Sequence, residues 1–281
     1  MEQAAGVVLA GGRSTRMGAP KATLEWHGST LLRRVCGLVA RGTGGPVVVV
    51  RAPGQVLPAL GRGVEVVDDA REGRGPLQGL AAGLRAVGDR AEVAYVSSTD
   101  VPLLHPWFVR RVLEAVGEDV DVALPRAGGH PHPLAAAYRV GLLAQVEQLL
   151  AEDRLRPAFL FERCRVRRLG EQELLADRRL SAVDPALDSV LNVNEPGEYE
   201  AARARPAPQV SVERFGALRR GGPNGRVGVR AATLGAAAAA AGVALDEHVV
   251  AAVNGDQITR DPLEPLAEGD AVALMAADAG G

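Results

Sequence analysis

The sequence predicts an α/β protein in two parts: a large domain with a mostly parallel sheet, followed by a small α+β domain. Three observations lead to this prediction. Short valine-rich runs alternate with amphipathic segments through most of the chain, a joint with two prolines follows at residues 204–208, and the order of elements changes beyond it. Proline-rich joints are stiff and carry no helix or strand of their own. We therefore expect domains at residues 1–203 and 209–281.

The strands of the large domain are predicted from short apolar runs, which are typical of strands buried on both faces. They cover residues 7–10, 47–50, 64–67, 93–96 and 120–124. Apolar residues at helical spacing predict helices at 31–39, 77–87 and 106–116, and a last helix at 198–204. This alternation of strand and helix favours a mostly parallel sheet with helices on both sides.

The small domain is predicted from a β-β-α-β-β order of elements. Strands are expected at residues 209–215, 226–230, 249–253 and 271–276, the first two joined as a hairpin across 221–225. Thr233 is the expected N-cap of a helix at 236–241, which Gly242 ends. Asn254-Gly255 is the expected turn after the third strand.

The composition limits the classes of function. A net charge of −2 and a pI near 6.2 argue against nucleic acid as a partner held by bulk charge. No apolar run approaches the roughly 20 residues needed to cross a bilayer, and the N-terminus lacks the pattern of a signal peptide. Cys36 and Cys164 lie far apart, without the spacing of a metal site. We expect a soluble, cytoplasmic protein with no membrane partner.

A glycine-rich segment after the first strand contains the strongest functional signal. The chain has one lysine, Lys21, among 32 basic residues, and it follows this segment, which also carries Arg13 and Arg16. Backbone N–H groups of such a loop bind anions, and glycines let phosphate approach the main chain. The segment has neither the G-x-x-x-x-G-K-[ST] nor the G-x-G-x-x-G pattern. This argues against a P-loop kinase and an NAD-dependent dehydrogenase.

Two acids are expected at the same edge of the sheet, because ligands bind outside the carboxyl ends of strands in open α/β sheets. Asp100 ends the strand near residues 93–96, and Asp69 ends the one before it. A carboxylate facing a triphosphate needs a divalent cation between them, and Mg²⁺ takes carboxylate and phosphate oxygens. Asp100 could instead cap the following helix, and Asp69 with Gly75 could form an ordinary loop and cap.

The glycine-rich segment closely resembles the nucleotidyltransferase signature L-A-G-G-x-S-x-R-M-G-x-x-K. The residues that match in order and spacing are Leu9, Ala10, Gly11, Gly12, Ser14, Arg16, Met17, Gly18 and Lys21. Within this signature, the double glycine Gly11-Gly12 resembles that of the molybdenum cofactor guanylyltransferases. The resemblance implies a Rossmann-like nucleotidyltransferase domain that transfers GMP from Mg-GTP to the phosphate of molybdopterin, or molybdenum cofactor, and releases pyrophosphate.

The same resemblance implies roles for individual residues. It gives nucleotide binding to Leu9, Ala10, Gly11, Gly12, Lys21, Asp69, Gly75 and Asp100. Arg16, Lys21 and Asp100 would act on the phosphates in catalysis, and Asp100 and Asn194 would hold Mg²⁺. Asn194 could equally serve turn chemistry. The family often has Asn after its second strand, where this chain has Arg51-Ala52, so that contact near the base is in doubt.

The C-terminal part resembles the ubiquitin-like sulfur carriers, in particular the small subunit of molybdopterin synthase. The similar segments are 253–255, 266–272 and the pair Gly280-Gly281. The resemblance implies a β-grasp fold whose terminal carboxylate is adenylated by an E1-like enzyme and delivers sulfur to the synthase large subunit. Three alternatives stay open: a CTP- or sugar-nucleotide-type transferase, a front domain that only tethers the carrier, and a β-grasp module without carrier function.

Overall fold

The computed structural model describes residues 4–11, 17–69, 71, 73–221 and 225–276. Within these residues the chain forms two compact units. One falls within Met1–Leu24 and Leu31–Pro196, and the other within Glu25–Thr30 and Gly197–Gly281. Gly12, Arg16, Gly280 and Gly281, which the sequence marked as functional, lie outside the described residues.

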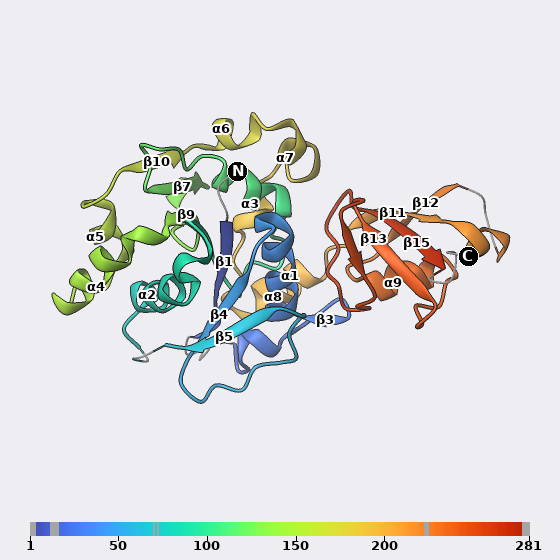
Figure 1. The fold of residues 1–281 in the computed structure, drawn as a ribbon, viewed down its shortest axis with the longest axis horizontal. Helices are drawn as coiled ribbons and strands as arrows, with labels where there is room; N and C mark the ends of the chain where they lie inside the picture. Colours follow the sequence, from blue (N-terminus) through green and yellow to red (C-terminus); the bar gives the residue numbers. More distant parts are fainter. Residues whose placement is uncertain (1–3, 12–16, 70, 72, 222–224, 277–281) are drawn as a thin grey trace. The chain divides into compact units, whose positions relative to one another are not determined.

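The first unit is built on a mixed sheet whose strand order is β10-β7-β9-β6-β1-β4-β5, with β8 paired to β7 (Figure 1). The strands are β1 Ala4–Leu9, β4 Val47–Arg51, β5 Val64–Asp68, β6 Val93–Ser98, β7 Val122–Ala127, β8 His130–Pro131, β9 Ala135–Arg139 and β10 Val166–Leu169. β9 runs antiparallel to β6 and β7, and the other pairs along this order are parallel. The expected valine-rich strands are therefore confirmed, and β9 is an antiparallel addition.

Helices cover both faces of this sheet, as expected (Figure 1). Helix α1 (Leu31–Thr43) lies over the face to which Gly6 points, because a Cβ on Gly6 would come within 2.3 Å of Val39. Successive strand residues face opposite sides, so Val7 points to the other face, where it approaches Gly83 of α2 (Pro76–Val87) equally closely. Helix α3 (Pro106–Leu113) packs beside α1, and α4 (Leu143–Ala151) packs beside α2.

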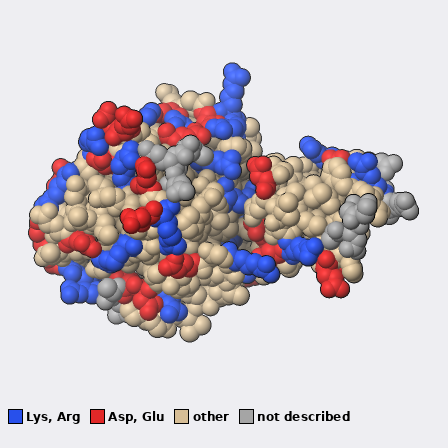
Figure 2. Space-filling model, viewed as in Figure 1, with Lys and Arg blue, Asp and Glu red and all other residues tan. Residues whose placement is uncertain are grey.

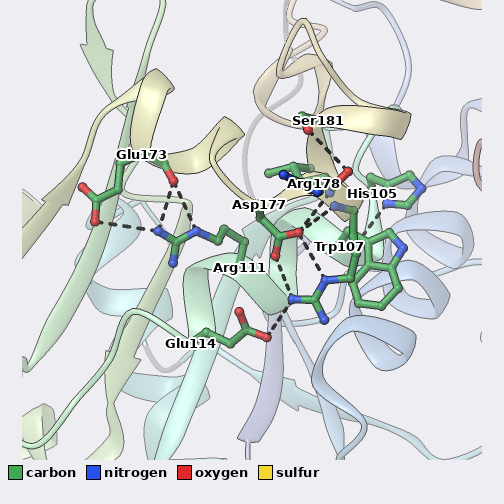
Figure 3. Close-up of polar contacts among 10 residues, drawn as sticks. His105, Trp107, Arg111, Glu114, Glu173, Asp177, Arg178 and Ser181 are labelled. Carbon is green, nitrogen blue, oxygen red and sulfur yellow. Dashed lines mark hydrogen bonds and ion pairs between the residues drawn. The ribbon is translucent and has the colours of Figure 1, made fainter.

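Short elements complete the first unit. They are η1 Lys21–Thr23, η2 Gly88–Arg90, η3 Val140–Leu142, α5 Pro157–Phe161, α6 Glu171–Leu175, α7 Arg178–Val183 and η4 Asp188–Val190. A polar network joins α7 to α3 (Figure 3). Asp177 caps α7 by accepting a hydrogen bond from Arg179 N at 2.8 Å. Its carboxylate also forms an ion pair with the guanidinium of Arg179 at 2.7 Å. This pairing lowers the pKa of Asp177 to about 2.

The same guanidinium anchors α7 on α3. Arg179 reaches Glu114 at 3.3 Å, and it lies 4.5 Å from the centre of the Trp107 ring. Arg110 lies over the Trp107 ring at 4.7 Å. Nearby, Arg111 donates to the main-chain oxygen of Glu173 at 3.1 Å (Figure 3). The Trp107 ring therefore contacts two guanidinium groups.

The second unit begins with a hairpin from early in the sequence, β2 (Glu25–Trp26) and β3 (Ser29–Thr30). It contacts α8 (Pro196–Arg203), which was expected at 198–204. Arg203 Nε donates to Glu25 at 2.6 Å, and the Tyr199 hydroxyl donates to the main-chain oxygen of Glu25. The hairpin and α8 thus belong to one unit although they are far apart in sequence.

The rest of the second unit is a five-stranded sheet with one helix. The strands are β11 Gln209–Arg214, β12 Arg226–Arg230, β13 Val249–Val253, β14 Gln257–Thr259 and β15 Ala271–Ala276, in the order β12-β11-β15-β13-β14. β11 and β15 run parallel, and the other neighbours run antiparallel. Helix α9 (Leu234–Ala240) packs on the sheet and is capped by Thr233, as expected, whose Oγ1 accepts from Ala236 N at 3.3 Å. η5 (Gly216–Gly221) precedes β12, and part of the expected hairpin turn lies outside the described residues.

Acidic and basic side chains are interspersed over the face drawn in Figure 2. Many form exposed pairs, such as Arg163 with Glu152 at 2.6 Å and Arg165 with Asp121 at 2.8 Å. Exposed pairs of this kind each contribute little to the free energy of unfolding. In the described part of the chain, no helix is long and apolar enough to span a bilayer.

Candidate active site

A pocket of about 540 Å³ opens where β1, β4, β5 and β6 end and α2 begins. All of its lining residues belong to the first unit. They are Leu9, Ala10, Gly11, Lys21, Val50, Ala52, Asp69, Gly73, Gly75, Pro76, Gly79, Ser98, Thr99, Asp100 and Leu134. The described nucleotide-site residues expected from the sequence therefore lie together, at the carboxyl ends of parallel strands.

The end of β1 is held in place by main-chain and side-chain bonds. Ala10 N and Gly11 N both donate to Val50 O, at 2.8 and 3.2 Å. The side chain of Gln55 makes two further bonds. Gln55 Nε2 donates to Ala10 O at 3.0 Å, and Gln55 Oε1 accepts from Ala52 N at 3.0 Å. A Cβ on Gly11 would lie 3.2 Å from Ala52 N, so glycine lets the two strand ends approach closely.

Lys21 and Asp100 meet at the pocket, although 79 residues separate them. Lys21 Nζ donates to Asp100 Oδ2 at 2.7 Å and to Asn194 Oδ1 at 2.9 Å. The side chains of Lys21 and Asp100 are only 18% and 13% exposed. Three residues that the sequence marked for phosphate or metal thus form one cluster.

The Asp100 carboxylate is oriented by its neighbours. Ser98 Oγ donates to Asp100 Oδ1 at 2.5 Å, and Asn192 Nδ2 donates to the same oxygen at 3.1 Å. The main-chain oxygen of Asp100 accepts from Val193 N at 2.9 Å. Asp100 is not the cap of the next helix, because His105 caps α3 through its ring nitrogen. These contacts leave Oδ2 directed at the lysine.

Asp69 and Gly75 line the opposite part of the pocket. Burial raises the pKa of Asp69, although Arg71 N at 3.2 Å and the Gln78 side chain donate to its carboxylate. Gly75 has φ +78° and precedes Pro76, the first residue of α2. This backbone conformation is open to glycine at little cost. It brings the N-terminus of α2, where the helix dipole is positive, to the pocket.

Arg51 does not replace the family's asparagine in the pocket. Its side chain donates to Asp68 at 2.7 Å and to Gln55 O at 3.0 Å. Ala52 lines the pocket instead. A side-chain amide still stands beside this strand end, because Gln55 bonds to Ala52 N and Ala10 O.

The cluster around Lys21 fits a divalent cation. Asp100 Oδ2 and Asn194 Oδ1 already converge on one cationic nitrogen, and hard oxygen donors are the ligands that Mg²⁺ takes. Among the residues with described coordinates, no three His, Cys, Asp or Glu side chains gather as a metal site. Waters or phosphate oxygens would therefore complete the coordination. The arrangement suits phosphate chemistry, because it offers one carboxylate for an ion and one ammonium for phosphate oxygens.

Sequence reasoning missed three residues that support the site. Ser98 orients Asp100, Gln55 ties two strand ends together, and Thr99 Oγ1 donates to Leu9 O at 3.0 Å. For Ser98 and Thr99 the signal was available, because a Ser-Ser-Thr run ends an otherwise apolar strand. For Gln55 no local pattern was available, since its partner Ala10 lies 45 residues away.

Comparison with known proteins agrees with this geometry. Residues 6–168 match the family of the MobA-like NTP transferase domain. A probable molybdenum cofactor guanylyltransferase of Pelotomaculum thermopropionicum is 36% identical over 203 residues, which cover 72% of this chain and 93% of that protein. A molybdenum cofactor guanylyltransferase of Desulfosudis oleivorans is 32% identical, with coverage of 73% and 96%.

A solved structure shares the fold of the same region. It is molybdopterin-guanine dinucleotide biosynthesis protein A of Archaeoglobus fulgidus, with a TM-score of 0.56 at 22% identity. The similarity covers 71% of this chain and 96% of that one. The expected resemblance to nucleotidyltransferases is thus confirmed by the family match and by the relatives, and the fold agrees. The chain belongs to the family of the MobA-like NTP transferase domain and is a nucleotidyltransferase.

Proposed function

We propose that this protein transfers GMP from Mg·GTP to the phosphate of the molybdenum cofactor and releases pyrophosphate. The observation that carries the proposal is the meeting of Lys21 and Asp100, 2.7 Å apart, at a pocket bordered by the end of β1. Similarity to guanylyltransferases over 72% of the chain supports guanine as the base and molybdopterin as the acceptor.

The reaction needs charge neutralisation more than proton transfer. An oxygen of the acceptor phosphate attacks the α-phosphorus of GTP, the bond from this phosphorus to the bridging oxygen breaks, and pyrophosphate leaves with the electron pair. The acceptor is already anionic near neutral pH, so no general base is required. The barrier comes from bringing two anions together. Fixed cations and preorganised N–H groups lower such a barrier.

The positive side of the pocket would bind the phosphates. We assign Lys21 to the α-phosphate and the charge that develops there, because its ammonium lies at the pocket on a flexible stem. Gly11 would lie beside the β- and γ-phosphates in this proposal without donating its N–H, which is bonded to Val50 O. Gly12 and Arg16, which lie outside the described residues, are assigned to the same phosphates.

Asp100 and Asn194 would hold Mg²⁺ between them. When bound, the ion neutralises phosphate oxygens as a Lewis acid. Ser98 and Asn192 keep the Asp100 carboxylate aimed at that position through Oδ1. Asn194 contributes a neutral oxygen, so the protein brings a single negative charge to the ion in this proposal.

The opposite wall would receive the nucleoside. Leu9 and Ala10 at the end of β1, with Gly75 at the start of α2, supply apolar and main-chain surface for base and ribose. Asp69 lines the same part of the pocket, and its carboxylate suits N–H and O–H donors of the nucleoside. No nucleotide contact is needed from Arg51, because its side chain is bound to Asp68.

The direct test is to incubate the purified protein with Mg²⁺, molybdopterin and each nucleoside triphosphate in turn, and to measure pyrophosphate. We expect release with GTP that depends on molybdopterin. Release with CTP, or with a sugar phosphate as acceptor, would favour the alternative of a CTP- or sugar-nucleotide-type transferase. No release with any triphosphate would favour a front domain that only tethers the C-terminal part.

Substitution of the paired residues tests the site itself. Lys21→Ala and Asp100→Ala should each lower kcat by about 10²-fold or more, the scale for loss of one preorganised electrostatic contact. Arg85→Ala is the control, because Arg85 is exposed on α2 and paired with Glu147. Pyrophosphate release and thermal unfolding should be measured together. Near-normal turnover in both pocket variants would refute the assignment.

We further propose that residues 209–281 form a β-grasp sulfur carrier, separate from a transferase at residues 1–203. The strand order β12-β11-β15-β13-β14, with β11 and β15 parallel and α9 packed on the sheet, supports this fold. Asn254 and Asp270 lock the β13 turn to the start of β15 through Nδ2 and Oδ1 at 2.8 Å. The proposed partners are an adenylating E1-like enzyme and the molybdopterin synthase large subunit.

Deletion of Gly281 separates the two proposed activities. The deletion should abolish formation of a terminal thiocarboxylate, read by intact mass after incubation with an adenylating enzyme, ATP and a sulfur donor. Nucleotidyl transfer should stay unchanged. Lys21→Ala should have the reverse effect. Absence of any thiocarboxylate on the unaltered chain would leave the β-grasp part as a module without carrier function.

A further inference from the structure

We infer that Lys21 occupies the divalent-cation position until nucleotide binds, so that the metal ion enters together with the triphosphate and not before it. This inference rests on the proposed function, because it takes Asp100 and Asn194 as the metal ligands. It adds an order of binding and a role for Lys21 in the protein without substrate.

The oxygens at this position are fixed, whichever cation they face. One Asp100 oxygen is held by Ser98 Oγ at 2.5 Å and by Asn192 Nδ2 at 3.1 Å, so the carboxylate cannot rotate freely. The main chain of Val193 is bonded to Asp100 O at 2.9 Å, which fixes the segment that carries Asn194. Asp100 Oδ2 and Asn194 Oδ1 therefore converge on one position from two segments of the chain.

The cation that these oxygens bind can be exchanged: it is either the Lys21 ammonium or a divalent metal ion. Lys21 Nζ lies 2.7 Å from Asp100 Oδ2 and 2.9 Å from Asn194 Oδ1, at the end of a four-carbon stem. A bound Mg²⁺ would lie about 2.0–2.1 Å from the same oxygens. An ammonium and a divalent ion repel each other strongly at so short a separation, and both side chains are mostly shielded from water. The two cations therefore exclude one another.

A triphosphate changes this competition. Without nucleotide, a metal ion must displace the ammonium and break its ion pair with Asp100. With nucleotide, the displaced ammonium gains phosphate oxygens at the same pocket. Metal and nucleotide should therefore bind with positive coupling, and the coupling is reciprocal by thermodynamic linkage.

The test uses Mn²⁺ as the probe and the full chain without nucleotide, with affinity measured from the electron paramagnetic resonance signal of free Mn²⁺. Lys21→Met removes the competing charge at nearly constant side-chain length. We expect it to bind Mn²⁺ about tenfold or more tightly than the unaltered chain, within the usual range of coupling factors. Equal or weaker binding by Lys21→Met would overturn the inference.

Two further variants make the result specific. Arg85→Met removes a basic group from an exposed ion pair far along α2, and it should leave Mn²⁺ affinity within about twofold, since exposed charges are screened. A tenfold gain in Arg85→Met would show that general charge, and not exchange at this site, sets the affinity. Asp100→Asn in the Lys21→Met background should abolish the tight binding. If tight binding survives there, the metal position in the proposed function fails as well.

Discussion

Asp100 and Asp69 line the same pocket but have different surroundings. Asp100 accepts hydrogen bonds from Lys21, Ser98 and Asn192. Asp69 sits at the other wall, where burial raises its pKa in spite of two donors. A carboxylate kept at some cost in its charged form is typical of binding and catalytic sites.

Replacement of Asp69 by asparagine should separate stability from binding. The raised pKa means that the charged form of Asp69 is disfavoured in the folded protein. The charged side chain therefore lowers the free energy of unfolding above the ordinary pKa of 3.8, and this loss disappears below that pH. Asp69→Asn should therefore leave the melting temperature at pH 7 equal or higher. The KM for GTP should rise about tenfold or more, since hydrogen bonds to charged groups carry about 1.5–3 kcal/mol.

Steady-state kinetics and a thermal melt at pH 7 check both halves of this prediction. The melt should be repeated at pH 3.5, where the difference in melting temperature between Asp69→Asn and the unaltered chain should shrink. A lower melting temperature at pH 7 with an unchanged KM would mean that Asp69 is a structural residue of its loop.

Gln55 adds side-chain hydrogen bonds between the ends of β1 and β4. Its amide donates to Ala10 O and accepts from Ala52 N, both at 3.0 Å, and so holds the peptide before Gly11. Gln55→Ala should raise the KM for GTP by about 5- to 20-fold, the range for loss of one or two hydrogen bonds that position a binding loop. Its neighbour Val56, which is 83% exposed, gives the control Val56→Ala.

Gln55→Glu refines this test. Glutamate can still accept from Ala52 N, but it cannot donate to Ala10 O and it adds a negative charge near the phosphates. We expect a larger rise in KM than for Gln55→Ala, with thermal unfolding nearly unchanged. Equal KM values for Gln55→Ala, Gln55→Glu and Val56→Ala would contradict a positioning role.

The cap of α7 makes a prediction about acid stability. Asp177→Ala removes both the cap and the partner of Arg179, and it should lower the free energy of unfolding of the first unit by about 0.5–2 kcal/mol at pH 7. Because its pKa is lowered to about 2, the stabilisation is present above pH 3.8 and is lost as the pH falls through 2. Urea unfolding at pH 7 and pH 2 should show this difference. Asp177→Asn, which keeps a capping side chain, should lose less at pH 7.

The helices and strands that the sequence predicted share a clear local pattern. β4 and β6 are nearly uniform apolar runs because both faces are covered by helices. β9 was missed because Ala135–Arg139 has three alanines and no β-branched residue. β10 was missed because two arginines interrupt a short strand that pairs on one side only. Such strands are specified by their partners and not by their own residues.

The site was predictable to the same degree. Asp69 and Asp100 at strand ends and Lys21 after the glycine-rich segment are local signals, and the structure places all three at one pocket. Contacts between distant segments without a motif were not predictable, such as that of Gln55 with Ala10 across 45 residues. The sequence also gave no sign that the hairpin at Glu25–Thr30 clusters with α8.

The division of the chain into two units predicts how ligands affect its unfolding. The pocket lies within the first unit, so Mg·GTP should stabilise that unit alone. At a nucleotide concentration 100 times Kd, the gain should be about 2.7 kcal/mol. Calorimetry of the full chain should resolve two transitions, of which one shifts upward with Mg·GTP.

Lys21→Ala provides the control for this experiment, because it should reduce the nucleotide-dependent shift, measured from its own scan without nucleotide. A shift of both transitions by equal amounts would contradict independent unfolding of the two units. A shift that Lys21→Ala leaves intact would instead contradict binding at this pocket.

The reversed direction of β9 decides which part of the chain flanks the pocket. A parallel strand at this place would end there and lead into another helix. β9 instead begins there, directly after Leu134, at the edge where β6 ends. The connection from β7 to β9 thus reaches the cavity at Leu134, and it includes β8, which pairs with β7. Changes that keep this pairing would alter one border of the pocket and leave the strand ends that carry Asp69 and Asp100 in place.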